Sequence, residues 1–143
     1  MYNNPWLLND QPFLTDDIKD NYGFVYCITD TVNGRKYIGR KYFWSVRKVV
    51  GKRKKSKKES DWQDYYSSSD VLHTLIKEHG PDRFKREILF LGKTKGQVNY
   101  MEIKLQFQLD VLECLMENGQ RQYYNENIAS RYFVPKHLKE KNG

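Results

Sequence analysis

The chain has 143 residues, of which 30% are charged, and its 25 Lys and Arg against 18 Asp and Glu give a net charge of +7. This length suits one domain with a core of its own, and no apolar run reaches the roughly 18 residues of a membrane-spanning helix. No leader of charged and then apolar residues opens the chain, so we expect a cytoplasmic protein without a membrane partner.

The N-terminal part of the sequence predicts an arm followed by a β-hairpin. Residues 1–21 contain two prolines, while Trp6, Phe13 and other apolar side chains are available to hold this arm against the body. Residues 24–28 are rich in aromatic and β-branched side chains, which favours a strand. The Asn33-Gly34 pair favours a tight turn. A β-hairpin is therefore predicted over residues 24–39.

The positive charge is concentrated in residues 31–58, which contain twelve Lys and Arg and no acidic residue, and 13 basic and 18 acidic residues remain elsewhere. Within this segment we expect a short helix over 41–50 and a basic loop over 48–60. The charge and the interleaved aromatic side chains suit a nucleic acid, and a solvated lysine loop is the alternative. We predict backbone contacts from Arg40, Lys41, Lys48, Lys52, Arg53, Lys54, Lys55, Lys57 and Lys58.

The middle of the chain predicts a helix and a third strand. Ser68 or Ser69 can cap a helix that ends at His79-Gly80-Pro81. The run 84–91 then predicts a strand. Residues 98–116 show a strand period, but their length and their richness in Leu, Glu, Gln, Lys and Met favour a helix. We choose the helix.

These elements predict an α+β fold with a small three-stranded antiparallel sheet flanked by helices, in the order β-β-α-α-β-α. The expected organisation is an N-terminal arm over 1–21, one domain over 22–130 that includes the basic loop, and a polar tail over 131–143.

The predicted hairpin also contains a known pattern. Val25-Tyr26 in its first strand and Tyr37-Ile38-Gly39 in its second resemble the GIY-YIG nuclease family, which is named for Gly-Ile-Tyr and Tyr-Ile-Gly in such a hairpin. The two tyrosines have the spacing of that family. Phe24 stands where the first glycine is expected, and Gly23 lies one residue early.

Three downstream residues extend the resemblance in the same order. The family carries an arginine eight residues after its second motif, which matches Arg47. It carries a metal-binding glutamate in a later helix, for which Glu102 is the candidate, and a final asparagine, which matches Asn125. Asn127 competes for the last role, and Glu87 and Glu113 are weaker candidates for the glutamate.

The resemblance implies an Mg²⁺-dependent (or Mn²⁺-dependent) DNA endonuclease of the phage or homing-endonuclease type, which would act in the host cytoplasm. Glu102 would hold the metal, and Arg47 would bind phosphate oxygens. Tyr26 or Tyr37 would orient or activate the water, which requires neighbouring cations to lower a tyrosine pKa near 10. Asn125 would brace the site. A homodimer suits double-strand cleavage, although no residue pattern requires one.

One position departs from the family. Several relatives carry a His, Tyr or Lys base four residues after the arginine, where this chain has Gly51, so that Lys48 or Lys52 would have to replace it. The alternative function is therefore a catalytically weak or inactive nucleic-acid-binding module with the same fold. A basic structural protein of a ribonucleoprotein is a third interpretation, in which Glu102 would have no role.

Overall fold

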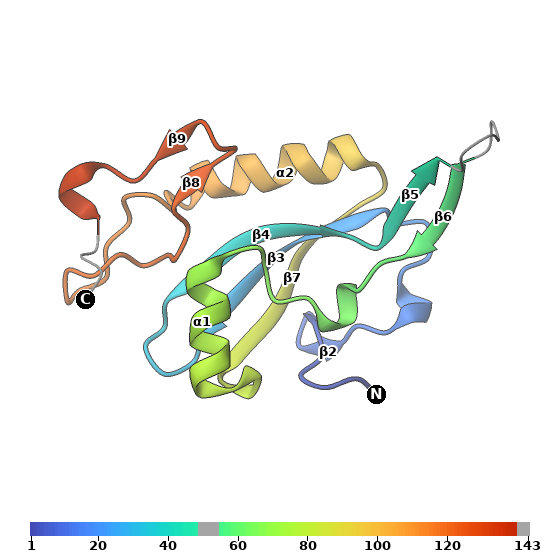
Figure 1. Cartoon of the computed structure of the whole chain (residues 1–143), viewed down its shortest axis with the longest axis horizontal. Helices are drawn as coiled ribbons and strands as arrows, with labels where there is room; N and C mark the ends of the chain where they lie inside the picture. Colours follow the sequence, from blue (N-terminus) through green and yellow to red (C-terminus); the bar gives the residue numbers. More distant parts are fainter. Residues whose placement is uncertain (49–54, 140–143) are drawn as a thin grey trace.

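The computed structural model describes residues 1–48 and 55–139, and these form a mixed sheet of five strands with helices on both faces (Figure 1). The strand order is β2-β1-β7-β3-β4. β1 runs parallel to β7, and the other neighbours are antiparallel. The α+β class is confirmed, and the sheet is larger than the three strands predicted. Its strands are β1 (Leu7–Leu8), β2 (Gln11–Pro12), β3 (Gly23–Asp30), β4 (Lys36–Tyr42) and β7 (Phe84–Gly92).

The predicted hairpin is confirmed as β3 and β4, which pair from Gly23–Tyr42 to Thr29–Lys36. Gly34 takes a φ of +79° in the connecting turn, a conformation that glycine adopts without steric cost. Phe24, Tyr26 and Ile28 pack on one face of the sheet, and Val25 and Cys27 pack on the other. β3 is buried on both faces, which explains its continuous apolar sequence.

Residues 1–21 contribute β1 and β2 to the edge of the sheet. Trp6 and Phe13 are both buried in the main hydrophobic cluster. The Trp6 indole Nε1 donates a hydrogen bond of 2.7 Å to the carbonyl of Trp62, and the buried Arg86 guanidinium donates to the carbonyls of Asn3 and Asn4. The two added strands have two residues each, which is too short for any periodicity to reveal them.

The helices cover opposite faces of the sheet. Leu72 of α1 (Asp70–His79) packs with Phe24 and Tyr26, whereas Val98 of α2 (Lys95–Gln108) packs with Val25 on the other face. Ser69 caps α1 by accepting from the Leu72 amide at 3.2 Å, as the sequence predicted. Four short 3-10 helices complete the helical elements of the described chain: η1 (Thr15–Asp17), η2 (Trp62–Asp64), η3 (Pro81–Arg83) and η4 (Lys136–Leu138).

The choice of helix over strand for residues 98–116 is confirmed, but its bounds differ. α2 begins earlier because Thr94 caps it, accepting from the Gln97 amide at 3.1 Å. It ends at Gln108, and Asp110 then takes a φ of +52°, which turns the chain. Val111 and Leu112 are buried after this turn, so their apolar character reflects packing of a loop rather than a continuing helix.

The helix predicted over 41–50 is wrong. β4 runs to Tyr42, and β5 (Trp44–Lys48) pairs antiparallel with β6 (Lys55–Glu59) in a hairpin that extends beyond the sheet (Figure 1). The run Tyr42-Phe43-Trp44-Ser45-Val46 is aromatic and β-branched, and such a composition favours a strand over a helix. Residues 55–59 of the expected basic loop form β6.

The C-terminal segment lies along the free edge of β4. The Lys36 amide donates to the Gln122 carbonyl at 2.9 Å, and the Tyr124 amide donates to the Lys36 carbonyl at 2.7 Å. β8 (Asn127–Ile128) and β9 (Tyr132–Phe133) then form a small hairpin near α2, so the expected polar tail begins within ordered structure.

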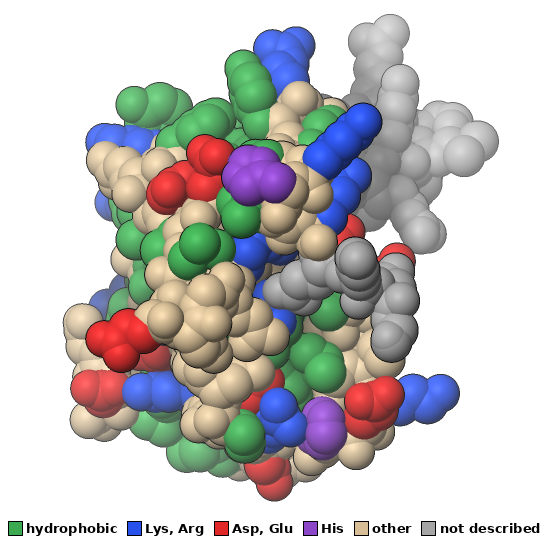
Figure 2. Space-filling view, turned by 90° about the vertical axis from the view of Figure 1, so that its left-hand side faces the viewer, with side chains coloured by type: hydrophobic (Ala, Val, Ile, Leu, Met, Phe, Trp, Pro, Cys, Tyr) green, Lys and Arg blue, Asp and Glu red, His purple; other side chains and the backbone are tan. Residues whose placement is uncertain are grey.

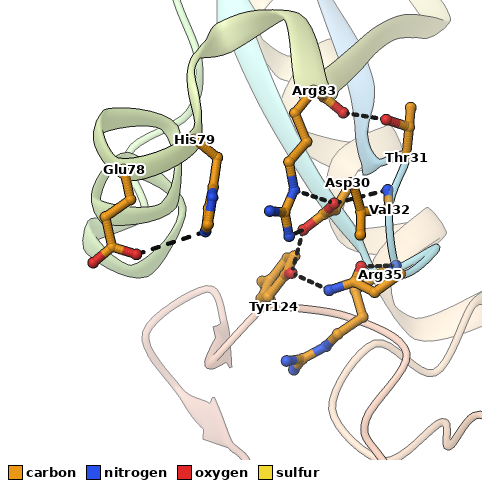
Figure 3. Close-up of polar contacts among 9 residues, drawn as sticks. Asp30, Thr31, Val32, Arg35, Glu78, His79, Arg83 and Tyr124 are labelled. Carbon is orange, nitrogen blue, oxygen red and sulfur yellow. Dashed lines mark hydrogen bonds and ion pairs between the residues drawn. The ribbon is translucent and has the colours of Figure 1, made fainter.

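A buried carboxylate fixes this segment to the sheet (Figure 3). Asp30, at the end of β3, accepts two hydrogen bonds from the Arg83 guanidinium at 2.8 and 2.9 Å and one from the Tyr124 hydroxyl at 2.9 Å. The Arg35 guanidinium lies 4.2 Å from the centre of the Tyr124 ring. Burial raises the pKa of Asp30, but the bonds from Arg83, Val32 and Tyr124 outweigh it, so the pKa is lowered overall.

Among the described residues, no helix has the length and the apolar character needed to cross a bilayer.

Candidate active site

The two motif tyrosines lie face to face on the β3–β4 hairpin. Tyr26 is 1% exposed, its ring stacks on that of Tyr37 with 6.3 Å between ring centres, and it meets the Tyr65 ring edge-on. Gly39 is the partner of Tyr26 across the strands. A methyl group at Gly39 would lie against the Tyr26 hydroxyl and 2.6 Å from its Cζ, so glycine is required where the tyrosine ring crosses β4.

A cavity of about 510 Å³ opens beside Tyr37, between the edge of β4, α2 and the segment that begins at Asn125. It gathers residues that are far apart in the sequence. Three of the five predicted catalytic residues line it, together with one of the predicted DNA contacts. These residues are Tyr37, Glu102, Asn125 and Arg40.

Glu102 projects from α2 into this cavity, with 16% of its side chain exposed. Its Oε1 lies 3.6 Å from Nη1 of Arg40. Burial raises the pKa of Glu102, and the guanidinium of Arg40 lowers it by less, so the pKa is raised overall. The carboxylate of Glu102 can attract a positive charge in the cavity, and the neighbouring Arg40 guanidinium offsets part of that attraction.

Arg40 is held in place from its other side. Its Nε donates to Oδ1 of Asn99 at 2.8 Å and to the Tyr42 hydroxyl at 3.1 Å, and the same hydroxyl donates to Asn99. Asn99 lies one helical turn before Glu102, so both meet Arg40 from the same face of α2. The guanidinium is therefore oriented by two polar groups while it faces the carboxylate.

Asn125 braces the edge of β4. Its Oδ1 accepts from the Ile38 amide at 3.0 Å, and its Nδ2 donates to the Ile38 carbonyl at 2.8 Å, as a neighbouring strand would. Gln106 of α2 donates to the same carbonyl at 3.0 Å. The Arg121 guanidinium donates to the Asn125 carbonyl at 2.7 and 2.9 Å. Both polar atoms of this amide are thus engaged with backbone.

The expectation that nearby cations lower a tyrosine pKa is wrong. Burial raises the pKa of Tyr26 well above 10, and the neighbouring Tyr65 and Tyr37 add to the shift. Burial also raises the pKa of Tyr37, against smaller opposing effects of a hydrogen bond with Ser68 and of Arg40. Both hydroxyls are therefore protonated at neutral pH, and each can donate a hydrogen bond.

Most of the other predicted residues that the structure describes lie on the β5–β6 hairpin, and Lys41 lies near the end of β4. Arg47 lies on β5 opposite Ser56, and Lys48 on β5 opposite Lys55 of β6. Lys57 and Lys58 on β6 are exposed. Three predicted contacts, Lys52, Arg53 and Lys54, and the Gly51 position lie outside the described residues.

One face of the molecule shows how Lys and Arg side chains lie away from this hairpin (Figure 2). At the end of the molecule away from the β5–β6 hairpin, they are interspersed with Asp, Glu and hydrophobic side chains (Figure 2). This mixture agrees with the excess of acidic residues outside residues 31–58.

Among the alternatives, Asn127 also lines the cavity, whereas Glu87 lies on β7 near Lys85 and Glu113 is exposed after α2. Several other lining residues were missed, among them Asn99 and Glu126. The position of Asn99 three residues before Glu102 could have indicated it. Glu126 follows Asn125 directly, but a carboxylate in a loop gives no periodic signal.

The residues of the cavity fit a hard divalent cation. Among the described residues there is no group of three or more His, Cys, Asp or Glu side chains that could enclose a metal. Mg²⁺ needs less, because it is bound through one or two carboxylates and keeps water and substrate phosphate as its other ligands. Glu102 and Glu126 both line the open cavity and supply such carboxylates.

Comparison with known families agrees with this arrangement. Residues 6–128 match the family model described as "Putative endonuclease segE, GIY-YIG domain". The chain belongs to the GIY-YIG family. Searches of the curated proteins and of the solved structures gave no significant match. The GIY-YIG match begins at Trp6, so it includes β1 and β2 as well as the hairpin, both helices and Asn125. Membership of this family supports a nuclease function.

Proposed function

We propose that the chain is a Mg²⁺-dependent DNA endonuclease that hydrolyses phosphodiester bonds in the cavity beside Glu102. The observation that supports this most strongly is the meeting of a carboxylate, a guanidinium and a tyrosine at one open cavity, with 3.6 Å between Glu102 and Arg40. Phosphodiester hydrolysis needs charge stabilisation on the phosphate oxygens, an oriented water and help for the leaving oxygen.

Glu102, with Glu126 as a second carboxylate that lines the same cavity, would hold Mg²⁺ or Mn²⁺. When bound, the metal supplies positive charge to the phosphate oxygens and to the departing 3′ oxygen. The proximity of Arg40 lets its guanidinium bind the same phosphate group, and its planar donors suit phosphate geometry. Because Asn99 and Tyr42 orient Arg40, little side-chain freedom is lost when the phosphate binds.

Two arginines are candidates for binding the phosphate, and two tyrosines are candidates for orienting the water. Arg47 is the arginine that the family resemblance implies, and Arg40 is the arginine that lines the cavity. Tyr37 lines the cavity as a neutral donor that would orient a water or a phosphate oxygen, while Tyr26 supports it from behind through ring stacking. Asn125 would act by fixing the edge of β4 rather than by touching the substrate.

Basic side chains on and near the β5–β6 hairpin would bind the DNA backbone without reading its sequence. As in the phage-type, homing-endonuclease-like members that the sequence resembles, we place this enzyme in the host cytoplasm. We expect a homodimer if both strands are cut together, because one cavity serves one strand at a time.

The test is cleavage of supercoiled plasmid with Mg²⁺, with Mn²⁺ and with EDTA. Glu102→Gln keeps the size of the side chain and removes its charge, so we expect cleavage to fall about a hundred-fold or more, a loss typical of removing one group that stabilises transition-state charge. Glu113→Gln is the matched control and should cut normally. Cleavage by Glu102→Gln at the normal rate would contradict the assignment.

The same assay compares the two arginines. We expect Arg40→Ala to lose most of the cleavage, and a larger loss in Arg47→Ala would return the phosphate role to Arg47. Thermal unfolding of each variant separates lost chemistry from lost folding.

A nucleic-acid-binding module without catalysis is the second candidate. Two observations favour it: Gly51 stands at the usual base position, and burial keeps both tyrosines protonated. Binding of DNA by the unaltered protein without any cleavage in Mg²⁺ or Mn²⁺ would support this candidate over the enzyme.

A further inference from the structure

A second hollow of about 260 Å³ adjoins the catalytic cavity and is not used by the chemistry proposed above. It lies between the end of β4, the start of β5 and residues 60–65. Arg40 lines both hollows, so they share one wall at β4. The rest of its lining consists of one lysine, three aromatic residues and two serines, and contains no acidic residue.

The cations around this hollow are held on aromatic rings. Nζ of Lys41 lies 4.1 Å from the centre of the Tyr65 ring, and Nζ of Lys57 lies 4.2 Å from the centre of the Trp44 ring. The Arg40 guanidinium lies 5.4 Å from the ring of Tyr42. A ring that supports an ammonium group limits its motion without neutralising its charge. Two cations, Arg40 and Lys41, thus line the hollow, and Lys57 lies over Trp44, one of its lining residues.

Lys41 already binds an anionic group. Its Nζ lies 2.6 Å from Oδ1 of Asp61, whose side chain is 71% exposed, whereas the side chain of Lys41 is 19% exposed. Lys41 therefore has a fixed, half-buried ammonium, and its partner is a carboxylate at the surface. A carboxylate and a phosphate present similar charged oxygens to an ammonium. Because the Asp61 side chain is exposed, another anion can reach Lys41 and take the place of this carboxylate.

We propose that this hollow is a phosphate-binding subsite, in which the carboxylate of Asp61 holds Lys41 in the free protein and a DNA backbone phosphate replaces it in the complex. The subsite takes a phosphate that flanks the one in the catalytic cavity, because Arg40 forms the shared wall. This inference rests on the proposed function for its ligand, DNA. The subsite adds a second phosphate contact on the same DNA strand. It also makes Asp61 a competitor of the phosphate for Lys41, which weakens DNA binding.

The test measures the affinity for a fluorescein-labelled DNA duplex by fluorescence anisotropy in EDTA, where no cleavage is required. Lys41→Met keeps the apolar stem over Tyr65 and removes the charge. We expect its Kd to rise about ten-fold, the effect of one charge-assisted contact, and the slope of log K against log salt concentration to fall by about one. Asp61→Asn releases Lys41 and should lower the Kd several-fold.

A matched ion pair elsewhere on the surface controls for net charge. Nζ of Lys93 lies 3.2 Å from Oδ2 of Asp20, and both side chains are exposed. Lys93→Met and Asp20→Asn change the total charge by the same amounts but lie outside the hollow. The subsite is supported if the Lys41 and Asp61 variants shift the Kd much more than these controls. Equal shifts in both pairs, or no DNA binding by the unaltered protein, would overturn it.

These outcomes are separate from those of the cleavage assay. A protein that binds DNA through Lys41 but never cuts it would contradict the nuclease and leave the subsite standing. If the Lys41→Met variant binds DNA with normal affinity while the unaltered protein cuts DNA, the subsite alone is contradicted.

Discussion

The two ends of β4 have opposite kinds of neighbours. At the end near Ile38, the exposed edge of the strand is closed by amide groups from Asn125 and Gln106, and by backbone pairing with Tyr124. At the end near Lys41, the same edge carries cations that contact aromatic rings and exposed carboxylates. The first end fixes the geometry of the site, and the second keeps its charged groups available to a ligand.

This difference has a physical basis. Backbone hydrogen bonds in a buried setting cannot be exchanged for water without cost, so they define one arrangement. Ion pairs at the surface exchange partners easily. The cavity of the candidate active site is lined by residues of both kinds, Asn125 from the hydrogen-bonded end of β4 and Arg40 from the charged end.

The largest effect is expected from the braced end. Asn125→Leu removes the acceptor of the buried Ile38 amide, while Gln106 continues to bind the Ile38 carbonyl. An unpaired buried amide costs about 1–3 kcal/mol, and with the lost donor bond we expect a decrease of about 3 kcal/mol in the free energy of unfolding. Urea unfolding followed by circular dichroism measures it. Asn127→Leu is the control, and an equal loss there would show that the brace is not specific.

A smaller effect is expected from the buried carboxylate behind this brace. Asp30→Asn removes the negative charge and turns one accepting oxygen into an NH₂ group that cannot accept from Arg83 or Tyr124, which should cost about 2 kcal/mol at pH 7. Because the pKa of Asp30 is lowered on folding, its contribution is present above the unfolded pKa of about 3.9 and is lost as the pH falls through the folded pKa.

The pH dependence provides the measurement for Asp30. The melting temperatures of the unaltered protein and of Asp30→Asn should differ most near neutral pH and converge below about pH 4. The exposed Asp82→Asn serves as control, since it should follow the unaltered protein at every pH. A difference for Asp30→Asn that stays constant down to pH 2 would show that the carboxylate charge is not responsible.

The smallest effect is expected at the charged end. Tyr42→Phe removes the hydroxyl that connects Arg40 and Asn99 but keeps the ring near Arg40 and Lys95. We expect a stability change within about 0.5 kcal/mol and a few-fold lower cleavage rate, because Arg40 is less well oriented. Parallel unfolding and cleavage measurements test this. A large loss of stability with unchanged cleavage would reverse the contrast between the two ends.

The sequence predicted the local elements better than the contacts between them. The β3–β4 hairpin and the cap of α1 follow from turn and capping residues that act within a few positions. Glu102 and Asn125 were placed near Tyr37 only through the resemblance to a family, because no local rule connects residues so far apart. The structure brings all three to one cavity.

The failures have the same origin. The pairing of β5 with residues 55–59 was not predicted, because those residues belong to a lysine-rich segment without apolar periodicity, which favours a loop. The pKa of Tyr37 was expected to fall because its charged neighbours are visible in the sequence. Its burial is not visible there, and burial is the larger influence.

The position of β7 in the sheet has a consequence for the order in which the chain can assemble. β7 is the last of the five strands to be synthesised, yet it lies between β1 and β3. Until synthesis passes Phe84, the pair β1–β2 and the hairpin β3–β4 therefore have no strand between them to join them by hydrogen bonds into one sheet. The sheet is completed when β7 inserts between β1 and β3, and not when a strand is added at an edge. The N-terminal strands therefore join the sheet only after the much later β7 has been synthesised.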